Sequence, residues 1–213
     1  MKRKVLDPLE RMSEILFGII MVLTFTGSIR VADVGRADLR EVLVGALGCN
    51  LAWGVVDAVM YLMSAFMTRA RLVVSLKALR GTQESEAAHG IIADLLPSEL
   101  ATSLTPQEVE TLRQRLNQQS PSAVAVGLTR TDWLGAAAVF LLVFLSTFPV
   151  AIPLIVVREP RLALGLSNTV AVLMLFALGW SIGRYAGRSG WWTALGMVMV
   201  GLVLVGLTMA LGG

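Results

Sequence analysis

The chain has few residues of the kinds that carry covalent or acid–base chemistry. Its 213 residues include one cysteine, Cys49, and one histidine, His89. One cysteine excludes a disulfide-stapled secreted scaffold, and the two residues together leave little room for nucleophilic catalysis. No phosphate loop, zinc signature or hydrolytic triad is present, and no segment alternates as a β-strand does. An enzyme is therefore not expected.

Charged residues are also scarce. They make up 15% of the chain, while hydrophobic residues make up 55% and the mean hydropathy is +0.72. Soluble domains carry roughly a quarter charged residues. A chain of 22.9 kDa has too small an interior to bury so much apolar surface, so a lipid bilayer is the expected solvent. The basic residues flank the apolar segments instead of forming a patch of their own, so nucleic acid is not expected as a partner.

Five apolar segments dominate the sequence, and each is long enough to cross roughly 30 Å of hydrocarbon as a helix. They cover residues 12–29, 42–67, 133–157, 162–182 and 191–211. Residues 68–131 are polar and have a helical pattern. We therefore predict an all-α polytopic membrane protein with five transmembrane helices and a small helical cytoplasmic insertion between helices 2 and 3. The predicted domains are 1–67, 68–131 and 132–213.

The orientation follows from the basic residues. Five spans place the two termini on opposite sides of the membrane. With the N-terminus inside, 13 of the 18 Lys and Arg residues lie inside, and the outer five are Arg30, Arg36, Arg40, Arg158 and Arg161. The positive-inside rule then favours a cytoplasmic N-terminus and an external C-terminus. The expected location is the inner (plasma) membrane, with residues 68–131 in the cytoplasm.

The polar segment carries helix signals of its own. Thr105-Pro106-Gln107-Glu108 has the pattern of a capping box, with threonine at the N-cap and glutamate three residues later. It predicts a helix over Glu108–Gln118 with Val109, Leu112 and Leu116 on one stripe. Pro97 marks the end of one helix and the start of another, because proline is tolerated only in a first turn. Two or three short amphipathic helices are expected here.

Asp57 is the most unusual residue in the apolar segments, because it is a carboxylate within a predicted span. It lies near the middle of residues 42–67, where an unpaired carboxylate costs about 3 kcal/mol or more. Helical spacing places Asn50, Gly54, Asp57, Tyr61 and Ser64 on one stripe, beside a second stripe of Met60, Met63 and Met67. A carboxylate, an amide and thioethers suit a first-row divalent metal ion. In the alternative interpretation, Asp57 is a protonated carboxyl group hydrogen-bonded within the bundle and the methionines only fill space.

Glu14 is a second acidic residue at the edge of a span. It follows Glu10 by one turn and Asp7 by one heptad, so three carboxylates share one helical face at the membrane surface. They could gather cations at the mouth of a path. The alternative is simple solvation at the interface, with Arg11 as an ionic partner.

The polar segment contains one Glu-x-x-His pair, formed by Glu86 and His89. On a helix the two side chains share a face, as they do in di-iron bundles. Those bundles need two such motifs, and this sequence has one. The pair is therefore either a metal ligand set or, in the alternative interpretation, two solvated side chains.

The order of these parts resembles the vacuolar iron transporter family. The resemblance rests on the acidic opening of the first span, Ser13–Gly18, and on the small-residue pattern Gly45–Gly54 in the second. It also rests on the proline pair Pro149 and Pro153 in the third span and on Gly179–Arg184 at the end of the fourth. It implies a dimeric metal/proton antiporter that carries Fe²⁺ and sometimes Mn²⁺ along the first two helices at the dimer interface.

Carried over by position, Glu14 stands for the acidic residue of the family's first span. Asn50 falls where the second-span glutamate is expected, and Ala58 falls near the methionine that follows it. Asp57 and Met60 would then supply the carboxylate and the thioether.

These observations together predict a divalent metal/proton antiporter that exports metal from the cytoplasm. The candidate metal ligands are Glu14, Asn50, Asp57, Met60, Glu86 and His89. No permanently bound cofactor is expected, and Fe²⁺ or Mn²⁺ would be the transported ion. A homodimer with Asp57 at its interface is expected, because five thin spans shield Asp57 and Asn50 poorly from lipid. The alternative is a non-transporting membrane module whose cytoplasmic helices recruit a partner protein.

Overall fold

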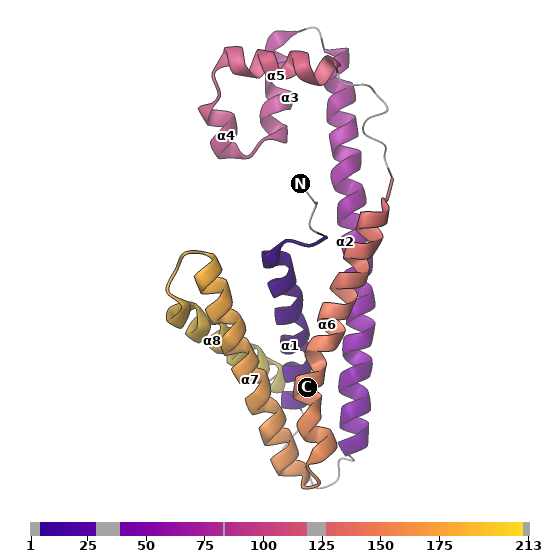
Figure 1. Ribbon diagram of the computed structural model, residues 1–213, viewed down its shortest axis with the longest axis vertical. Helices are drawn as coiled ribbons and strands as arrows, with labels where there is room; N and C mark the ends of the chain where they lie inside the picture. The colour runs from indigo at the N-terminus through magenta and orange to yellow at the C-terminus, as the bar shows by residue number, and fades with distance from the viewer. Residues whose placement is uncertain (1–4, 29–38, 83, 119–126, 211–213) are drawn as a thin grey trace. The chain divides into compact units, whose positions relative to one another are not determined.

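The computed structural model describes residues 5–28, 39–82, 84–118 and 127–210. Within these ranges the chain forms eight α-helices and no strand (Figure 1), so the predicted all-α class is confirmed. They are α1 (Pro8–Ser28), α2 (Leu39–Gly81), α3 (Ser85–Leu95), α4 (Ser98–Ser103), α5 (Pro106–Gln118), α6 (Arg130–Val156), α7 (Pro160–Tyr185) and α8 (Gly190–Ala210). Two predicted span ends, Ile29 and Leu211, and the predicted outer residues Arg30 and Arg36 lie outside the described residues.

The chain divides into two compact units. One unit comprises Met1–Tyr61 and Trp133–Gly213, and we call it the bundle unit. The other comprises Leu62–Asp132, and we call it the polar unit. One boundary falls within α2 and the other within the first turn of α6. The predicted division at residues 67 and 131 stays a prediction.

Four of the described helices are long and apolar enough to cross a membrane. They are Arg40–Gly81, Arg130–Val156, Pro160–Tyr185 and Gly190–Leu207. The chain is therefore a helical, multi-pass membrane protein. α1 is not among the four: its first two turns carry Glu10, Arg11 and Glu14, and its apolar part begins only at Ile15. The fifth predicted span stays a prediction.

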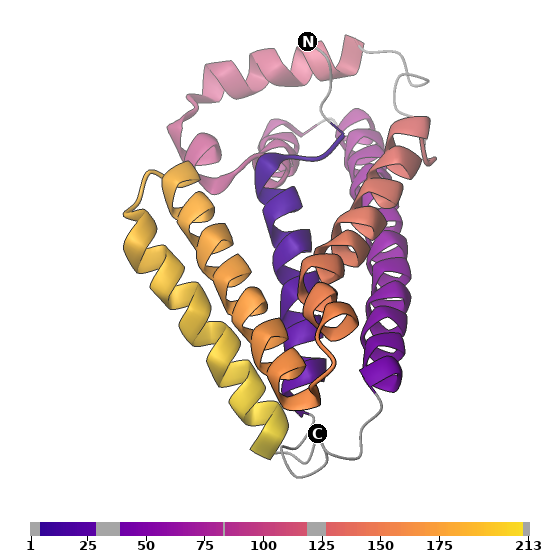
Figure 2. The ribbon, with the colours of Figure 1, turned by 60° about the horizontal axis from the view of Figure 1, so that its bottom comes forward.

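The fully buried residues of the largest core cluster in the bundle unit come from four helices, and α8 packs against them. Ile19 and Leu23 of α1 are buried against Ala46 of α2, Val150 of α6 and Leu175 of α7. α8 packs along α7, and both views show the two helices side by side (Figures 1 and 2). Glycines allow this close approach, since a Cβ on Gly179 would lie only 2.7 Å from the Cα atom of Ala194.

α6 continues through both of its prolines, Pro149 and Pro153. A proline within a helix removes one backbone donor, and neighbouring helices commonly compensate in membranes. The carbonyl groups that lose their intrahelical donor are those of Leu145 and Pro149. The hydroxyl of Ser167 on α7 donates to the next carbonyl oxygen along α6, that of Val150, 2.7 Å away. This hydrogen bond ties α7 to the proline-containing half of α6.

The polar unit has a small apolar core of its own. Leu79 of α2 is buried with Ala88 and Ile92 of α3, and Val109, Leu112 and Leu116 of α5 pack against them. The predicted stripe on α5 is therefore confirmed. The predicted capping box is confirmed as well, because the backbone N–H of Thr105 donates to Glu108 Oε2 at 2.8 Å. These hydrogen bonds hold the pKa of Glu108 below its ordinary value of 4.5.

Candidate functional site

The structure brings together two of the predicted acidic ligands. The carboxyl group of Glu14, in the second turn of α1, lies close enough to that of Asp57 on α2 for a side-chain hydrogen bond. Both residues are partly buried. The sequence predicted each of them separately, one at the edge of a span and one in the middle of another. Their contact joins α1 to α2 and forms a pair of adjacent carboxyl groups, which we call the carboxyl pair.

Asn50 forms a second polar contact on the same two helices. Its side chain is fully buried, and its amide nitrogen donates to the carbonyl oxygen of Gly18 at 3.0 Å and to the hydroxyl of Thr147 on α6. Among the groups that the structure describes, its carbonyl oxygen Oδ1 has no hydrogen-bond partner. Buried polar atoms are rarely left unpaired in proteins. Asn50 therefore joins three helices and still has one oxygen available to accept a donor or a cation.

The pairs Glu14–Asp57 and Gly18–Asn50 show that α1 and α2 run antiparallel at this contact. Between them, the rings of Phe17 and Trp53 meet edge to face with centroids 5.9 Å apart. Gly18 is essential to the approach of α6, because a Cβ there would lie 2.6 Å from the carbonyl oxygen of Val143 and would also clash with Ser146. Small residues thus set the spacing at which the polar groups meet.

The carboxyl pair and Asn50 occupy two successive levels along α2. Seven residues separate Asp57 from Asn50, which is roughly 10 Å along a helix axis. Carboxylate and amide oxygens are ligands that divalent cations bind. Two carboxyl groups in contact can also hold a proton between them. Across the described parts of the chain, no three His, Cys, Asp or Glu side chains come together as a metal-ligand set.

Met60 is a candidate ligand on the exposed surface of α2. It follows Asp57 by three residues, and 59% of its surface is exposed. Tyr61, next in sequence, packs against Gly135 of α6 and so lies on the inner side of the helix. The candidate thioether thus lies on the face of α2 that the described parts of the bundle unit leave uncovered.

The predicted Glu86–His89 pair lies on α3 in the polar unit. His89 Nε2 is 3.4 Å from Glu110 Oε2 of α5, and Arg113 reaches the same carboxylate oxygen at 3.4 Å. Glu86 is exposed. The structure therefore brings His89 to an acidic residue of another helix, and the metal-binding role of Glu86 and His89 stays a prediction.

An ion pair that the sequence interpretation missed lies within the polar unit. Arg69 of α2 binds both carboxylate oxygens of Asp132, and its guanidinium also donates to the carbonyl oxygen of Gly127 at 2.7 Å. Asp132 accepts the backbone N–H and the hydroxyl of Thr129 as well, so it completes a capping box at the start of α6. The spacing Thr-x-x-Asp, from Thr129 to Asp132, could have indicated this capping box in the sequence. This network fixes the start of α6 against α2.

The sequence comparisons identify the family. The model of the VIT family matches residues 69–213, which is more than half of the chain. No curated protein matches the sequence. The matched range includes Glu86 and His89 but not Glu14, Asn50, Asp57 or Met60. Together with the helical membrane architecture, the match confirms the resemblance seen in the sequence: the chain belongs to the VIT family, whose members transport metal ions across membranes.

Proposed function

We propose that this protein is a divalent metal/proton antiporter that exports Fe²⁺ or Mn²⁺ from the cytoplasm. Family membership supports metal transport across a membrane. The contact between Glu14 and Asp57 is the observation that supports coupling of transport to protons. Two carboxyl groups can share a hydrogen bond only when one of them holds a proton. A divalent cation that binds the pair favours its doubly ionised form and therefore releases that proton.

The remaining candidate ligands would bind the ion before or after this exchange of cation and proton. The oxygen Oδ1 of Asn50 supplies the next ligand atom along α2, and the Met60 thioether supplies a softer ligand that suits Fe²⁺ better than Mg²⁺. Glu86 and His89 would meet the ion in the predicted cytoplasmic domain, residues 68–131. The ion is cargo in this proposal, and no permanently bound cofactor takes part.

The proposed topology has five spans with the N-terminus inside. α1 is the additional span: its residues Ile19, Val22 and Leu23 are buried among helices that are themselves candidate spans, which supports a position at membrane depth. The positive-inside distribution supports a cytoplasmic N-terminus and an external C-terminus in the inner membrane.

The proposed assembly is a homodimer in which α2 faces its symmetry mate. Trp53, Val56 and Met60 form an exposed strip on α2 beside Asp57, with exposed fractions of 42%, 43% and 59%. A two-fold axis along this strip would bring two carboxyl pairs to one polar path. Cysteines introduced at Val56 or Met60 in a Cys49→Ser background should cross-link between protomers. Cross-linking only at Leu204 of α8 would place the interface elsewhere.

Transport assays with single substitutions test the function. In proteoliposomes, Mn²⁺ uptake driven by an imposed pH gradient should fall more than tenfold in Asp57→Asn and in Glu14→Gln, because each change removes one exchangeable carboxyl group. Asp94→Asn is the matched control, since Asp94 is an exposed carboxylate on α3. Uptake that ignores both the pH gradient and Asp57→Asn would contradict the proposal.

A second candidate function is a non-transporting module that recruits a partner protein. The observation that favours it is an apolar pocket of about 240 Å³ in the polar unit, lined by leucines of α2, α3 and α5 such as Leu76, Leu95 and Leu112. Calorimetry distinguishes the two functions. No measurable Mn²⁺ or Fe²⁺ binding, together with a partner lost in Leu112→Arg, would favour recruitment over transport.

A further inference from the structure

The turn between α7 and α8 is held in one conformation by its own hydrogen bonds. Gly187 has a φ of +67°, which a glycine adopts without strain. The backbone N–H of Arg188 donates to the carbonyl oxygen of Gly183 at 2.8 Å, and that of Gly187 donates to Arg184 at 3.3 Å. This pair of hydrogen bonds is the Schellman arrangement that ends many helices. It fixes the position from which the side chain of Arg188 extends.

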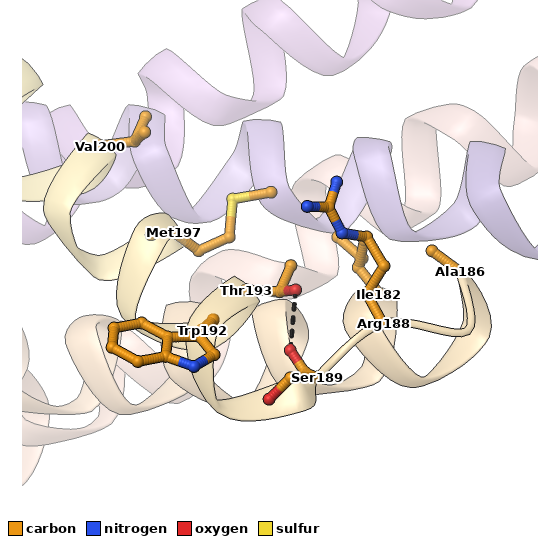
Figure 3. Close-up of a pocket in the computed structure, with 9 residues that line it drawn as sticks. Ile182, Ala186, Arg188, Ser189, Trp192, Thr193, Met197 and Val200 are labelled. Atoms are coloured by element: carbon orange, nitrogen blue, oxygen red, sulfur yellow. Dashed lines mark hydrogen bonds between the residues drawn. The ribbon is translucent and has the colours of Figure 1, made fainter.

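A pocket of about 800 Å³ opens beside this turn. Figure 3 shows its lining, with Arg188, Ser189 and Thr193 at one end and Met197 and Val200 further along α8. The hydroxyl of Thr193 donates to the backbone oxygen of Ser189 at 3.1 Å. The pocket is therefore polar and basic where the turn lies and apolar along the helix.

The dimensions of the pocket match one leaflet of a bilayer. Ser189 and Val200 are eleven residues apart, which is roughly 16 Å along a helix, and half of the hydrocarbon thickness is about 15 Å. Large aromatic side chains mark the polar end as the membrane–water interface, where they are enriched. Trp191 is 59% exposed, Trp192 78% and Tyr185 56%. The apolar part of the pocket thus lies at the depth of acyl chains.

Arg188 carries a positive charge at the polar end, where Asp7 accepts a hydrogen bond from the hydroxyl of Tyr185 at 3.4 Å. Arg188 is exposed, and in the described part of the chain its side chain makes no ion pair or hydrogen bond. Arg184, one turn earlier, adds a second positive charge at the same end. In the proposed orientation this turn faces the cytoplasmic leaflet, where anionic lipids give a negative surface potential.

We propose that this pocket binds one anionic phospholipid. The phosphate would lie against Arg188 and the hydroxyl of Ser189, and one acyl chain would follow Gly196, Met197 and Val200 along α8. The inference is independent of which ion the protein carries, so its failure would leave the proposed transport untouched.

Native mass spectrometry of the full-length protein tests the charge requirement. Phosphatidylglycerol should be retained about fivefold more than phosphatidylcholine of equal chain length, and Arg188→Gln should remove this preference. Arg158→Gln is the matched control, since Arg158 is an exposed arginine in the turn between α6 and α7. Equal retention of the two lipids by the unmodified protein, or an unchanged preference in Arg188→Gln, would overturn the proposal.

A second pair of variants tests the acyl-chain part of the pocket. A Cβ on Gly196 meets no other atom within 4 Å, so Gly196→Leu should fill the groove without disturbing the fold and should lower phosphatidylglycerol retention at least fivefold. Gly206, also on α8, has equally open surroundings, and Gly206→Leu should have no effect. Retention unchanged in Gly196→Leu would overturn the lipid assignment. Binding of inorganic phosphate that depends on Arg188 and ignores Gly196→Leu would instead indicate a simple anion site.

Discussion

Both units of the chain bury apolar side chains, but most of the buried polar side chains lie in the bundle unit. In the bundle unit, polar residues such as Asn50, Thr147 and Ser167 are fully buried, whereas Trp192 and Val156 are 78% and 71% exposed. In the polar unit, Leu79, Ala88 and Ile92 form the interior, and α5 has no buried residue. In lipid, exposed apolar side chains do not destabilise the fold, whereas unpaired polar groups do. In water, exposed apolar side chains are unfavourable and exposed polar groups are solvated. The exposed apolar and buried polar side chains of the bundle unit are therefore those expected of helices in lipid.

The forces that hold the two units together differ accordingly. The hydrophobic effect contributes little to the association of helices in lipid. Close packing at small residues and interhelical hydrogen bonds therefore provide most of the stability. Gly18, Asn50 and Ser167 supply both in the bundle unit. The polar unit is held together by an apolar cluster, and the hydrophobic effect stabilises such a cluster where the surrounding solvent is water. Substitutions matched between the two units should expose this difference.

Truncating a buried apolar side chain of the polar unit should have the largest effect. Ile92 is 1% exposed, so Ile92→Ala should cost about 3 kcal/mol through lost burial and a cavity. Leu173 on α7 is 62% exposed, and Leu173→Ala should cost less than about 1 kcal/mol. Amide hydrogen exchange in the affected helices measures both effects. Equal losses of protection would mean that the two units do not differ as described.

Adding one methyl group between helices of the bundle unit should have an intermediate effect. Gly18→Ala places a Cβ 2.6 Å from the carbonyl oxygen of Val143, and overpacking of this kind costs about 2 kcal/mol. Gly48→Ala, on α2, meets no atom within 4 Å and should be neutral or slightly stabilising. Thermal unfolding in detergent compares the two variants. A fall in the unfolding midpoint for Gly48→Ala as large as that for Gly18→Ala would contradict this packing.

The smallest effect is expected at the water-exposed start of α5. The pKa of Glu108 lies below 4.5 because Thr105 donates two hydrogen bonds to its carboxylate. A lowered pKa in the folded state means that this contribution to stability is present above about pH 4.5 and is lost as the pH falls through the lowered value. In Thr105→Ala, NMR titration of Glu108 should show its pKa returning part of the way toward 4.5, because the backbone N–H of residue 105 can still donate. An unchanged pKa would contradict the role of the hydroxyl.

Local features of the fold could be predicted from the sequence, whereas contacts between distant segments could not. The capping box of α5 and its stripe of Val109, Leu112 and Leu116 lie within a few residues of each other, so spacing alone reveals them. Glu14 and Asp57 could be singled out, because carboxylates are rare in apolar spans. Their mutual contact depends on how α1 and α2 are aligned along each other. The pattern of residues on one face of a single helix does not determine this alignment.

The ion pair between Arg69 and Asp132 shows the same limit. The two residues are 63 positions apart, and they lie at the two ends of the polar segment, where charged residues are ordinary. The hydrogen bond between Asn50 and Thr147 spans 97 positions. The sequence predicted that Asn50 would need shielding, and only the packing of α1, α2 and α6 shows how it is shielded.

The central claim is that a divalent cation and a proton exchange at the carboxyl pair. The direct test loads proteoliposomes with a pH-sensitive dye and adds Mn²⁺ outside, without an imposed pH gradient. We expect proton flux opposite to Mn²⁺ movement, and this flux should be lost in Asp57→Asn and retained in Asp94→Asn. Mn²⁺ movement without proton flux, or the same flux in Asp57→Asn as in the unmodified protein, would contradict it.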